Sequence, residues 1–206
     1  MGYQSWHEAP PYWGDVTRHF GSGDRVLDVG CGTGWLADHL GDYTGVDRDP
    51  GAVEEGQRQG RNIVHVDLDR SALPFPDASF DGAILKDVLE HVLESARLVR
   101  EVHRVLRDGG RAFASAPDVQ RWVWDDYTHV RPFSLKAFRR LFADHGFAVE
   151  GSGYESVMPG IELATRWSGR DRRPRLLNAL ARLPVVPRNV WLLGRKLSSP
   201  PANGEQ

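Results

Sequence analysis

Short runs of β-branched and other apolar residues recur along the chain, and most are followed by a segment with helical periodicity. Strands are predicted at residues 25–30, 43–47, 63–67, 80–86 and 111–117, with two later strands at 147–155 and 189–197. Helices are predicted at residues 35–40, from Pro50 onward, along an apolar stripe of Leu93, Leu98, Val102, Val105 and Leu106, and from Ser134 to His145. The Asp108-Gly109-Gly110 segment is expected to end the third helix, and Gly146 the fourth.

This alternation predicts an α/β fold. A Rossmann-like, doubly wound sheet of seven strands is expected, mainly parallel, with helices on both faces. The last two strands are expected to close the sheet as an antiparallel C-terminal pair. Because such sheets bind ligands at the carboxyl ends of their strands, near the reversal of strand order, the functional site is expected there.

Composition narrows the class of protein. The 206 residues are 40% hydrophobic and carry a net charge of −2, which is typical of one soluble globular domain and gives no basic field for nucleic acid. Cys31 is the single cysteine, so no internal disulfide is expected and a reducing cytoplasm fits best. No apolar run is long enough for a transmembrane segment. The histidines show no ligand-like spacing, and no metal site is expected.

The charge is unevenly distributed. Residues 1–156 hold 17 basic and 25 acidic side chains, whereas residues 157–206 hold 9 basic and 3 acidic ones. A solvated basic insertion is the simplest interpretation of the C-terminal part. Peripheral contact with a membrane surface or with an anionic or amphiphilic substrate is the alternative.

A glycine-rich loop follows the first predicted strand. The sequence Asp28-Val29-Gly30-Cys31-Gly32-Thr33-Gly34 combines glycines that permit positive φ with the start of a predicted helix. Asp47 ends the second strand, where a carboxylate can accept both hydroxyls of a ribose. Residues 32–37 also satisfy a dinucleotide-binding pattern, but the carboxylate of Asp28 suits a cationic amino group better than a pyrophosphate.

Four motifs now occur in order: VLDVGCGTGWL, GVDRDP, DLDRSALPFPDASFDGAILKDVLEHV and EVHRVLRDGGRAFASAP. Over residues 24–147 the chain resembles the class I S-adenosylmethionine-dependent methyltransferases of the small-molecule type. The resemblance implies S-adenosyl-L-methionine as cofactor. It places Asp28 and the loop from Gly30 through Cys31 and Gly32 to Gly34 at the methionine part of the donor, and Asp47 at the ribose.

The resemblance also assigns the adenine and methyl ends of the donor. Arg48 is expected to flank the adenine, Asp67 to accept from its amino group, and the amide of Leu68 to meet a ring nitrogen. The spacing that follows is two residues longer than expected, so Asp69 is an alternative to Asp67. Lys86 and Asp87 are expected at the methyl-donor end.

Aromatic residues are concentrated between the fifth strand and its following helix. Residues 118–133 hold Trp122, Trp124 and Tyr127 together with Arg131, and they are expected to line an acceptor site. A plain hydrophobic cover on the core is the alternative.

Two histidines are candidates for a general base. His129 lies in the aromatic segment, and its imidazole suits proton removal at neutral pH, although a structural role is the alternative. Residues 1–23 are expected to form a lid that contributes Trp6 and Tyr12 to the substrate site and His7 as the competing base. His91 is expected to support the fold through hydrogen bonds.

The expected organisation is a single methyltransferase domain over residues 1–206. Residues 24–147 form its cofactor-binding core, residues 118–133 and 157–188 cap the acceptor site, and residues 198–206 form a disordered tail. The expected reaction is methyl transfer to an O, N or activated C atom of a small or amphiphilic molecule, in bacterial specialised or envelope metabolism. The alternatives are a non-methylating reaction on the same fold, an inactive scaffold subunit and a nicotinamide-dependent dehydrogenase. The oligomeric state stays open.

Overall fold

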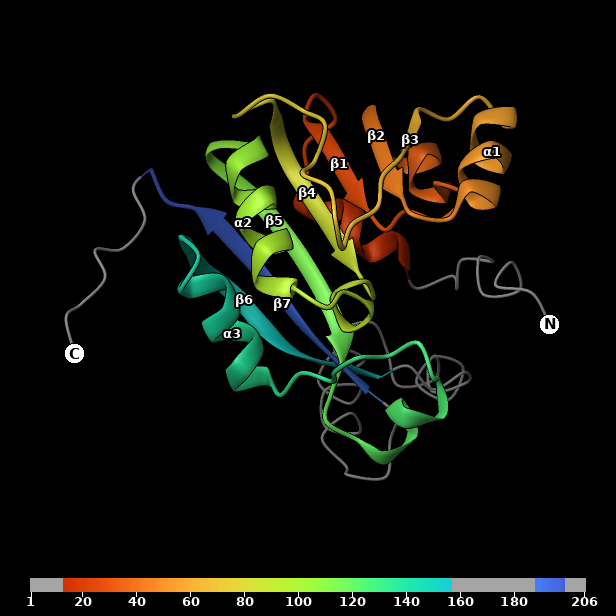
Figure 1. Cartoon of the computed structure of the whole chain (residues 1–206). Helices are drawn as coiled ribbons and strands as arrows, with labels where there is room; N and C mark the ends of the chain where they lie inside the picture. Colours follow the sequence, from red (N-terminus) through yellow and green to blue (C-terminus); the bar gives the residue numbers. More distant parts are fainter. Residues whose placement is uncertain (1–12, 157–187, 199–206) are drawn as a thin grey trace, which may run out of the picture.

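Seven strands form one sheet at the centre of the fold (Figure 1). The computed structural model describes residues 13–156 and 188–198. The strand order is β3-β2-β1-β4-β5-β7-β6; the first five strands pair in parallel, and β7 runs antiparallel to β5 and β6. The strands are β1 (Arg25–Val29), β2 (Asp42–Asp47), β3 (Ile63–His65), β4 (Phe80–Lys86), β5 (Leu106–Pro117), β6 (Phe147–Ser156) and β7 (Arg188–Lys196). The predicted fold class, including the antiparallel C-terminal pair, is confirmed.

Local side-chain chemistry sets the start of two helices. The α-helices of the described residues are α1 (Pro50–Arg58), α2 (Ser95–Val105) and α3 (Leu135–Ala143), and the 3-10 helices are η2 (Trp13–His19), η3 (Trp35–His39), η4 (Leu89–His91) and η5 (Arg121–Asp125). At α1, the Asp49 carboxylate accepts from the Gly51 amide at 2.8 Å. At α3, the Ser134 hydroxyl accepts from the Ala137 amide at 3.3 Å, which confirms the predicted cap.

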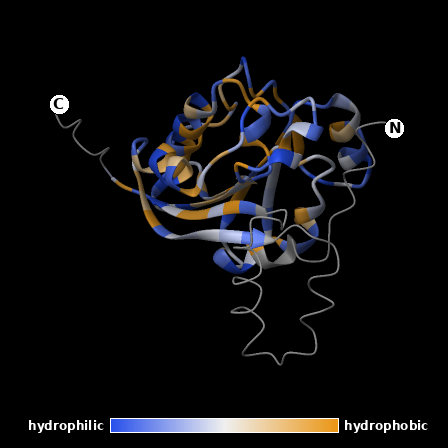
Figure 2. Cartoon of the chain, turned by 90° about the horizontal axis from the view of Figure 1, so that it is seen from below, coloured by the Kyte–Doolittle hydropathy of each residue, from blue (hydrophilic) through white to orange (hydrophobic). Residues whose placement is uncertain are grey.

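Two apolar clusters cover opposite faces of the sheet, because successive side chains of a strand point to opposite sides. Along β4, Ala83 and Leu85 join the cluster that contains Phe138 of α3 and the buried residues of α2. Ile84 joins the other cluster, with Val53 of α1 and residues of η2 and η3. In Figure 2 hydrophobic positions lie along the central strands, and the outer turns of the helices carry hydrophilic ones.

Two predicted helices differ from the structure. The predicted apolar stripe is longer than the helix at both ends: Leu93 precedes α2 and is 59% exposed, and Leu106 begins β5. The helix therefore ends before Asp108-Gly109-Gly110, the segment expected to end it, which lies inside β5. The Leu93 amide donates to the side chain of Asp69 at 2.8 Å, so a polar contact fixes this turn. Residues 35–39, predicted as a helix, form the short 3-10 helix η3.

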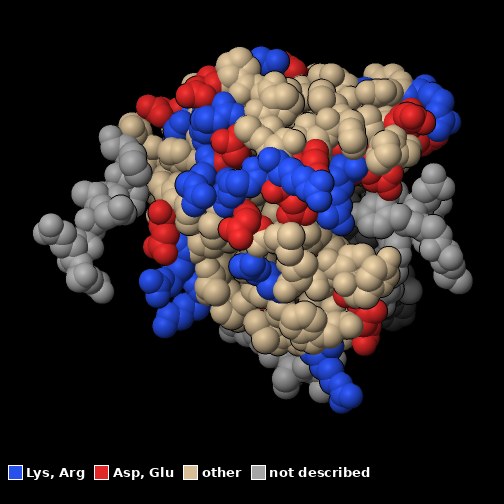
Figure 3. Space-filling model, viewed as in Figure 1, with Lys and Arg blue, Asp and Glu red and all other residues tan. Residues whose placement is uncertain are grey.

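Charged side chains are interleaved on the surface seen in Figure 3, where a band of basic groups is mixed with acidic ones. Arg104 pairs with Asp77 at 2.8 Å, and Arg107 pairs with Asp81. Opposite charges at this spacing screen each other, so this face carries no extended field of one sign. Within the described ranges, no helix has the length and apolar content needed to cross a bilayer.

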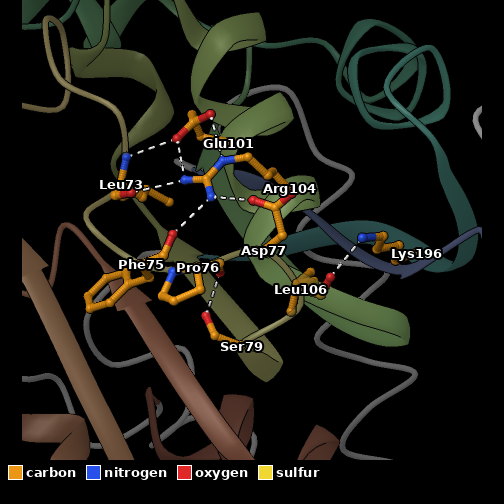
Figure 4. A network of polar contacts seen from close by, with 9 residues as sticks. All are labelled: Leu73, Phe75, Pro76, Asp77, Ser79, Glu101, Arg104, Leu106 and Lys196. Atoms are coloured by element: carbon orange, nitrogen blue, oxygen red, sulfur yellow. Dashed lines mark hydrogen bonds and ion pairs between the residues drawn. The ribbon is translucent and has the colours of Figure 1, made fainter.

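One arginine fixes the long loop that precedes β4 (Figure 4). Arg104 on α2 donates to the carbonyl of Leu73 at 2.9 Å, to the carbonyl of Phe75 at 2.9 Å and to Asp77 at 2.8 Å. Glu101, one turn earlier, accepts from both Arg104 and the Leu73 amide. Since the loop contains no regular hydrogen-bond ladder, these contacts replace one and hold it against α2.

Replacing this arginine should destabilise the protein. Arg104→Ala is expected to lower the free energy of unfolding by about 1–3 kcal/mol, because loop carbonyls and Glu101 lose charge-assisted hydrogen bonds. Urea unfolding measures the change. Arg58→Ala, which removes an exposed ion pair with Glu55, should change stability by less than about 0.5 kcal/mol. Equal effects of the two variants would show that the loop does not depend on Arg104.

Candidate functional site

Three strands that carry the predicted donor residues end at one edge of the sheet (Figure 1). β1 lies between β2 and β4, so the chain turns to one side after β1 and to the other side after β4. In open α/β sheets, ligands bind at the carboxyl ends of the strands next to such a reversal of strand order. Asp28 lies near the end of β1, Asp47 ends β2 and Lys86 ends β4. The fold therefore brings the three residues to a common edge.

The glycine loop after β1 is fixed by its own backbone. Gly30 and Gly34 have φ of 73° and 75°, and a Cβ on Gly30 would lie 2.6 Å from Val88. The amides of Gly30 and Cys31 donate to the Val46 carbonyl at 2.8 and 3.1 Å, and the Gly34 amide donates to the Cys31 carbonyl at 2.9 Å. These three N–H groups have acceptors within the protein. The loop therefore offers close approach of its backbone, and its place at the methionine part of the donor stays a prediction.

Asp47 is held in one orientation by two backbone amides. The Gly32 amide donates to Oδ2 at 2.7 Å, and the Asp49 amide donates to Oδ1 at 2.8 Å. The side chain is buried. Each carboxylate oxygen keeps a second lone pair, so the group can still accept two hydroxyl groups side by side. This geometry fits the two hydroxyls of a ribose.

Asp28 is a buried carboxylate near the glycine loop. Burial raises its pKa to about 7, the hydrogen bond from the Tyr43 hydroxyl at 3.0 Å lowers it, and the negative charge of Asp47 raises it. Such a group is ready to ionise when a cation binds beside it. A ligand amino group would supply that cation.

Cys31 packs inside the same loop. Its thiol is buried and contacts the Gly32 carbonyl at 3.5 Å. Burial, followed by the negative charges of Asp28 and Asp47, raises the thiol pKa well above its usual value. The thiol therefore stays neutral and is not an activated nucleophile.

Asp67 and Asp69, the two candidates for contact with adenine, differ in their contacts within the protein and in their exposure. Asp69 accepts from the Leu93 amide at 2.8 Å and lies 3.6 Å from Arg48, so its carboxylate is used within the protein. Asp67 accepts from the Asp69 amide at 3.0 Å and lies 3.7 Å from Arg70, but its side chain is 43% exposed, against 20% for that of Asp69. Leu68 between them is buried. This geometry favours Asp67 as the residue open to a ligand.

A polar network joins the ends of four strands. Lys86 lies 3.1 Å from Glu155 and 3.7 Å from Asp87. Ser115 and Asn189 donate to the same oxygen of Asp87 at 3.0 and 2.6 Å. Asp87 has φ of 52°, a strained value for a residue with a Cβ, and such strain often occurs at functional sites. The sequence pointed to Lys86 and Asp87, but it gave no signal for Glu155 and Asn189, which come from the antiparallel pair.

The aromatic loop does not act as a simple cover. Val123 and Phe133 are buried and join the protein interior, whereas Trp124 and Tyr127 are 57% and 96% exposed. Trp122 is half-buried, and its indole N–H donates to a glutamine side chain of the same loop at 2.6 Å. The alternative of a hydrophobic cover is therefore wrong for Trp124 and Tyr127.

Residues 118–133 are tied to the segment that follows β4. Arg131 donates to the Leu93 carbonyl at 2.8 Å. The amides of Val130 and Arg131 donate to the Glu90 carbonyl at 2.7 and 3.4 Å. Arg131 thus holds the loop against η4.

These contacts place His129 beside His91, with ring centroids 4.6 Å apart. His129 contacts the Val123 carbonyl through Nδ1 at 2.7 Å, and His91 contacts the Thr128 hydroxyl through Nδ1 at 3.0 Å. Burial, and then the neighbouring His129, lowers the pKa of His91. Glu90 is buried beside them, and burial raises its pKa well above the usual range. The hydrogen-bonded role predicted for His91 is confirmed, but the sequence did not indicate this cluster.

Several predicted residues lie outside the described ranges. These are Trp6, His7 and Tyr12 of the predicted lid, most of the 157–188 segment and the tail from residue 199. Their roles stay predictions.

The fold and this edge define an α/β protein of the nucleotide-cofactor-binding class. Residues 5–151 match the family described as "Methyltransferase domain", and the chain belongs to this family. A relative from Mycobacterium tuberculosis, named a "probable S-adenosylmethionine-dependent methyltransferase", is 32% identical over 175 residues, which cover 79% of this chain and 63% of that protein. The chain is thus a methyltransferase domain of the S-adenosylmethionine-dependent type, with S-adenosyl-L-methionine as its cofactor.

Solved structures show the same fold. An S-adenosylmethionine-dependent methyltransferase from Mesorhizobium loti has a TM-score of 0.69 at 21% identity, covering 92% of this chain and 100% of that one. The [4+2]-cyclase SpnF has a TM-score of 0.67 at 23% identity, covering 90% and 81%. The chain spans between 42% and 63% of the length of three curated relatives that it matches.

The raised pKa of Asp28 predicts how stability depends on pH. Between pH ~4 and about 7 the unfolded chain loses this proton while the native protein keeps it, so native stability falls as pH rises. Relative to Asp28→Asn, the wild-type free energy of unfolding should decline by up to about 4 kcal/mol over this window. Urea unfolding at several pH values measures it. The control Asp42→Asn, at the exposed start of β2, should run parallel to wild type, and a parallel curve for Asp28→Asn would contradict the assignment.

Proposed function

We propose that this protein transfers a methyl group from S-adenosyl-L-methionine to an O, N or activated C atom of a small or amphiphilic molecule. The observation that carries the proposal is the grouping of Asp28, the glycine loop and Asp47 at the reversal of strand order. A cytoplasmic role in bacterial specialised or envelope metabolism is part of the proposal.

The proposed donor orientation follows the strand ends. Asp28 meets the amino group of the methionine part, and the buried Asp47 accepts the two ribose hydroxyls. Asp67 accepts from the adenine amino group, with Arg48 at the flank and the Leu68 amide at a ring nitrogen. Lys86 and Asp87 then border the sulfonium end, where their network with β5, β6 and β7 fixes them.

The acceptor is proposed to bind over the aromatic loop. Trp124 and Tyr127 present large apolar surfaces outside the core, and Trp122 lies half-buried beside them. Arg131 fixes the far side of this loop. Exposed aromatic surface of this kind fits the apolar part of an amphiphilic acceptor.

The reaction is an in-line displacement. A lone pair of the acceptor forms a bond to the methyl carbon, the bond from that carbon to sulfur breaks, and S-adenosylhomocysteine leaves. The protein contributes alignment and exclusion of water. When the acceptor atom carries a proton, a base must take it, and His129 is the proposed base because its Nδ1 contacts a carbonyl and leaves Nε2 with a lone pair.

A second candidate function is a non-methylating reaction that uses the same donor site. The observation behind this candidate is that the [4+2]-cyclase SpnF has the same fold. Formation of S-adenosylhomocysteine in the presence of an acceptor separates the two. An inactive scaffold is less consistent with the fixed carboxylates of Asp28 and Asp47.

Binding of the donor product tests the proposed cofactor site. Calorimetric titration should show tight binding of S-adenosylhomocysteine and none of NADH. Asp47→Ala should weaken binding by about 100-fold or more, because two hydrogen bonds to a charged acceptor are lost. Asp42→Asn is the matched control and should bind as wild type does. Binding of NADH alone would overturn the proposal in favour of a dehydrogenase.

Turnover tests the proposed base. With an acceptor found by screening, His129→Ala should lower turnover by about 100-fold or more and leave the affinity for S-adenosylhomocysteine within about twofold. His145→Ala, at the end of α3, controls for loss of a histidine elsewhere. Unchanged turnover in His129→Ala would remove the base assignment.

A further inference from the structure

Two histidines and a glutamate meet between η4 and the aromatic loop. A carboxylate oxygen of Glu90 and one ring nitrogen each of His91 and His129 lie within 4.8 Å of one another. We propose that Glu90, His91 and His129 bind a divalent transition-metal ion on the acceptor side of the sheet edge. None of the predicted donor contacts involves these three residues, although all three lie within the family match and Glu90 and His91 lie near the end of the third motif.

Hydrogen bonds fix which nitrogen of each histidine is available. The Nδ1 of His129 lies 2.7 Å from the carbonyl of Val123, which can only accept, so Nδ1 carries the proton. The hydroxyl of Thr128 donates to Asp126 at 2.7 Å, so it accepts from Nδ1 of His91 at 3.0 Å. In the neutral rings both Nε2 atoms therefore keep a lone pair.

This hydrogen-bond pattern is the one that metal-binding histidines use. A ligating imidazole almost always donates its second N–H to a carboxylate, a backbone carbonyl or water. His129 has the carbonyl of Val123, and Nδ1 of His91 lies 3.4 Å from the Thr128 carbonyl and 3.0 Å from the Thr128 hydroxyl, which donates to Asp126. The orienting partners of a metal site are thus already in place.

Glu90 supplies a second, independent observation. Its side chain is 1% exposed, and its Oε2 is buried without a hydrogen-bond partner among the described residues. A buried carboxylate oxygen without a partner is costly, and buried charges in proteins are paired or bind metal ions. An ion between Glu90 and the two imidazoles would satisfy it.

The donor set selects the type of ion. Two imidazole nitrogens and one carboxylate oxygen suit Zn²⁺, Mn²⁺ or Fe²⁺, whereas Ca²⁺ and Mg²⁺ prefer oxygen alone. With bonds of about 2.1 Å, ligand atoms lie roughly 3.0–3.4 Å apart, so the three groups must close by about 1.5 Å at most. Three protein ligands leave positions open to a water, to Asp126 or to an acceptor oxygen; Asp126 lies 3.8 Å from Nε2 of His129.

A bound ion would change the role of His129 in the proposed methyl transfer, and only this consequence rests on the proposed function. A bound ion would take the Nε2 lone pair of His129 as a ligand, so His129 would not be the free base. The ion would instead bind an acceptor hydroxyl and lower its pKa, which favours an oxygen acceptor. The two roles of His129 exclude each other in the metal-loaded protein.

The test is metal binding by the untagged full chain. After dialysis against a chelator, calorimetric titration with Zn²⁺ and elemental analysis should show one bound ion per chain. Glu90→Gln, His91→Ala and His129→Ala should each weaken binding by roughly 100-fold or more, and Thr128→Val, which removes an orienting hydroxyl, by about tenfold. His145→Ala should bind as wild type does. Replacing Zn²⁺ by Co²⁺ should give visible absorption that His129→Ala loses.

Binding of S-adenosylhomocysteine shows that each variant is folded and keeps the two proposals separate. Wild type that binds S-adenosylhomocysteine but no Zn²⁺ overturns the metal site and leaves methyl transfer standing. Wild type that binds Zn²⁺ through the three residues but no S-adenosylhomocysteine supports the metal site and overturns the donor site. Zn²⁺ binding that survives in folded His129→Ala or His91→Ala overturns the metal site.

Discussion

The reversal of strand order between β1 and β4 is the constraint on which the rest of the structure depends. It sends the chain to opposite sides after these strands, and it brings backbone and carboxylate groups together at one edge. Asp47, at the end of β2, links this strand to the loop after β1, because its carboxylate accepts a hydrogen bond from the amide of Gly32. The positions of the glycine loop, Asp47 and Lys86 are all set by this arrangement.

The same edge concentrates negative charge in a buried place. Asp28 and Asp47 are both buried, and the charge of Asp47 adds to burial in raising the pKa of Asp28. Two nearby carboxylates with little solvent disfavour the doubly ionised state. A ligand with a cationic end and two hydroxyl donors satisfies both groups, so the site is complementary to such a ligand before it arrives.

Features that depend on residues close together in the sequence could be predicted from it, and features that depend on contacts between distant residues could not. The strands, the helix start at Pro50, the cap at Ser134 and the acidic residue of β2 follow from local patterns, and the structure has them. The exposed position of Leu93 does not follow from a local pattern, because its amide donates to Asp69, 24 residues earlier in the chain. Likewise, the hydrogen bond from Asn189 to Asp87 joins residues 102 positions apart, and no periodic pattern in the sequence predicts it.

The candidate site divides in the same way. The proposed donor half uses residues near strand ends, so short motifs contain its residues and make the family recognisable. The proposed acceptor half depends on packing between η4 and the loop after β5, and the contact of Thr128 with His91 spans 37 residues. Side chains as exposed as those of Trp124 and Tyr127 keep rotamer freedom, so they do not fix an acceptor in one orientation. Among the described residues on that side, Glu90, His91 and His129 are restrained by burial and hydrogen bonds. An ion held by them would give the acceptor half the fixed point that the donor half has in Asp47.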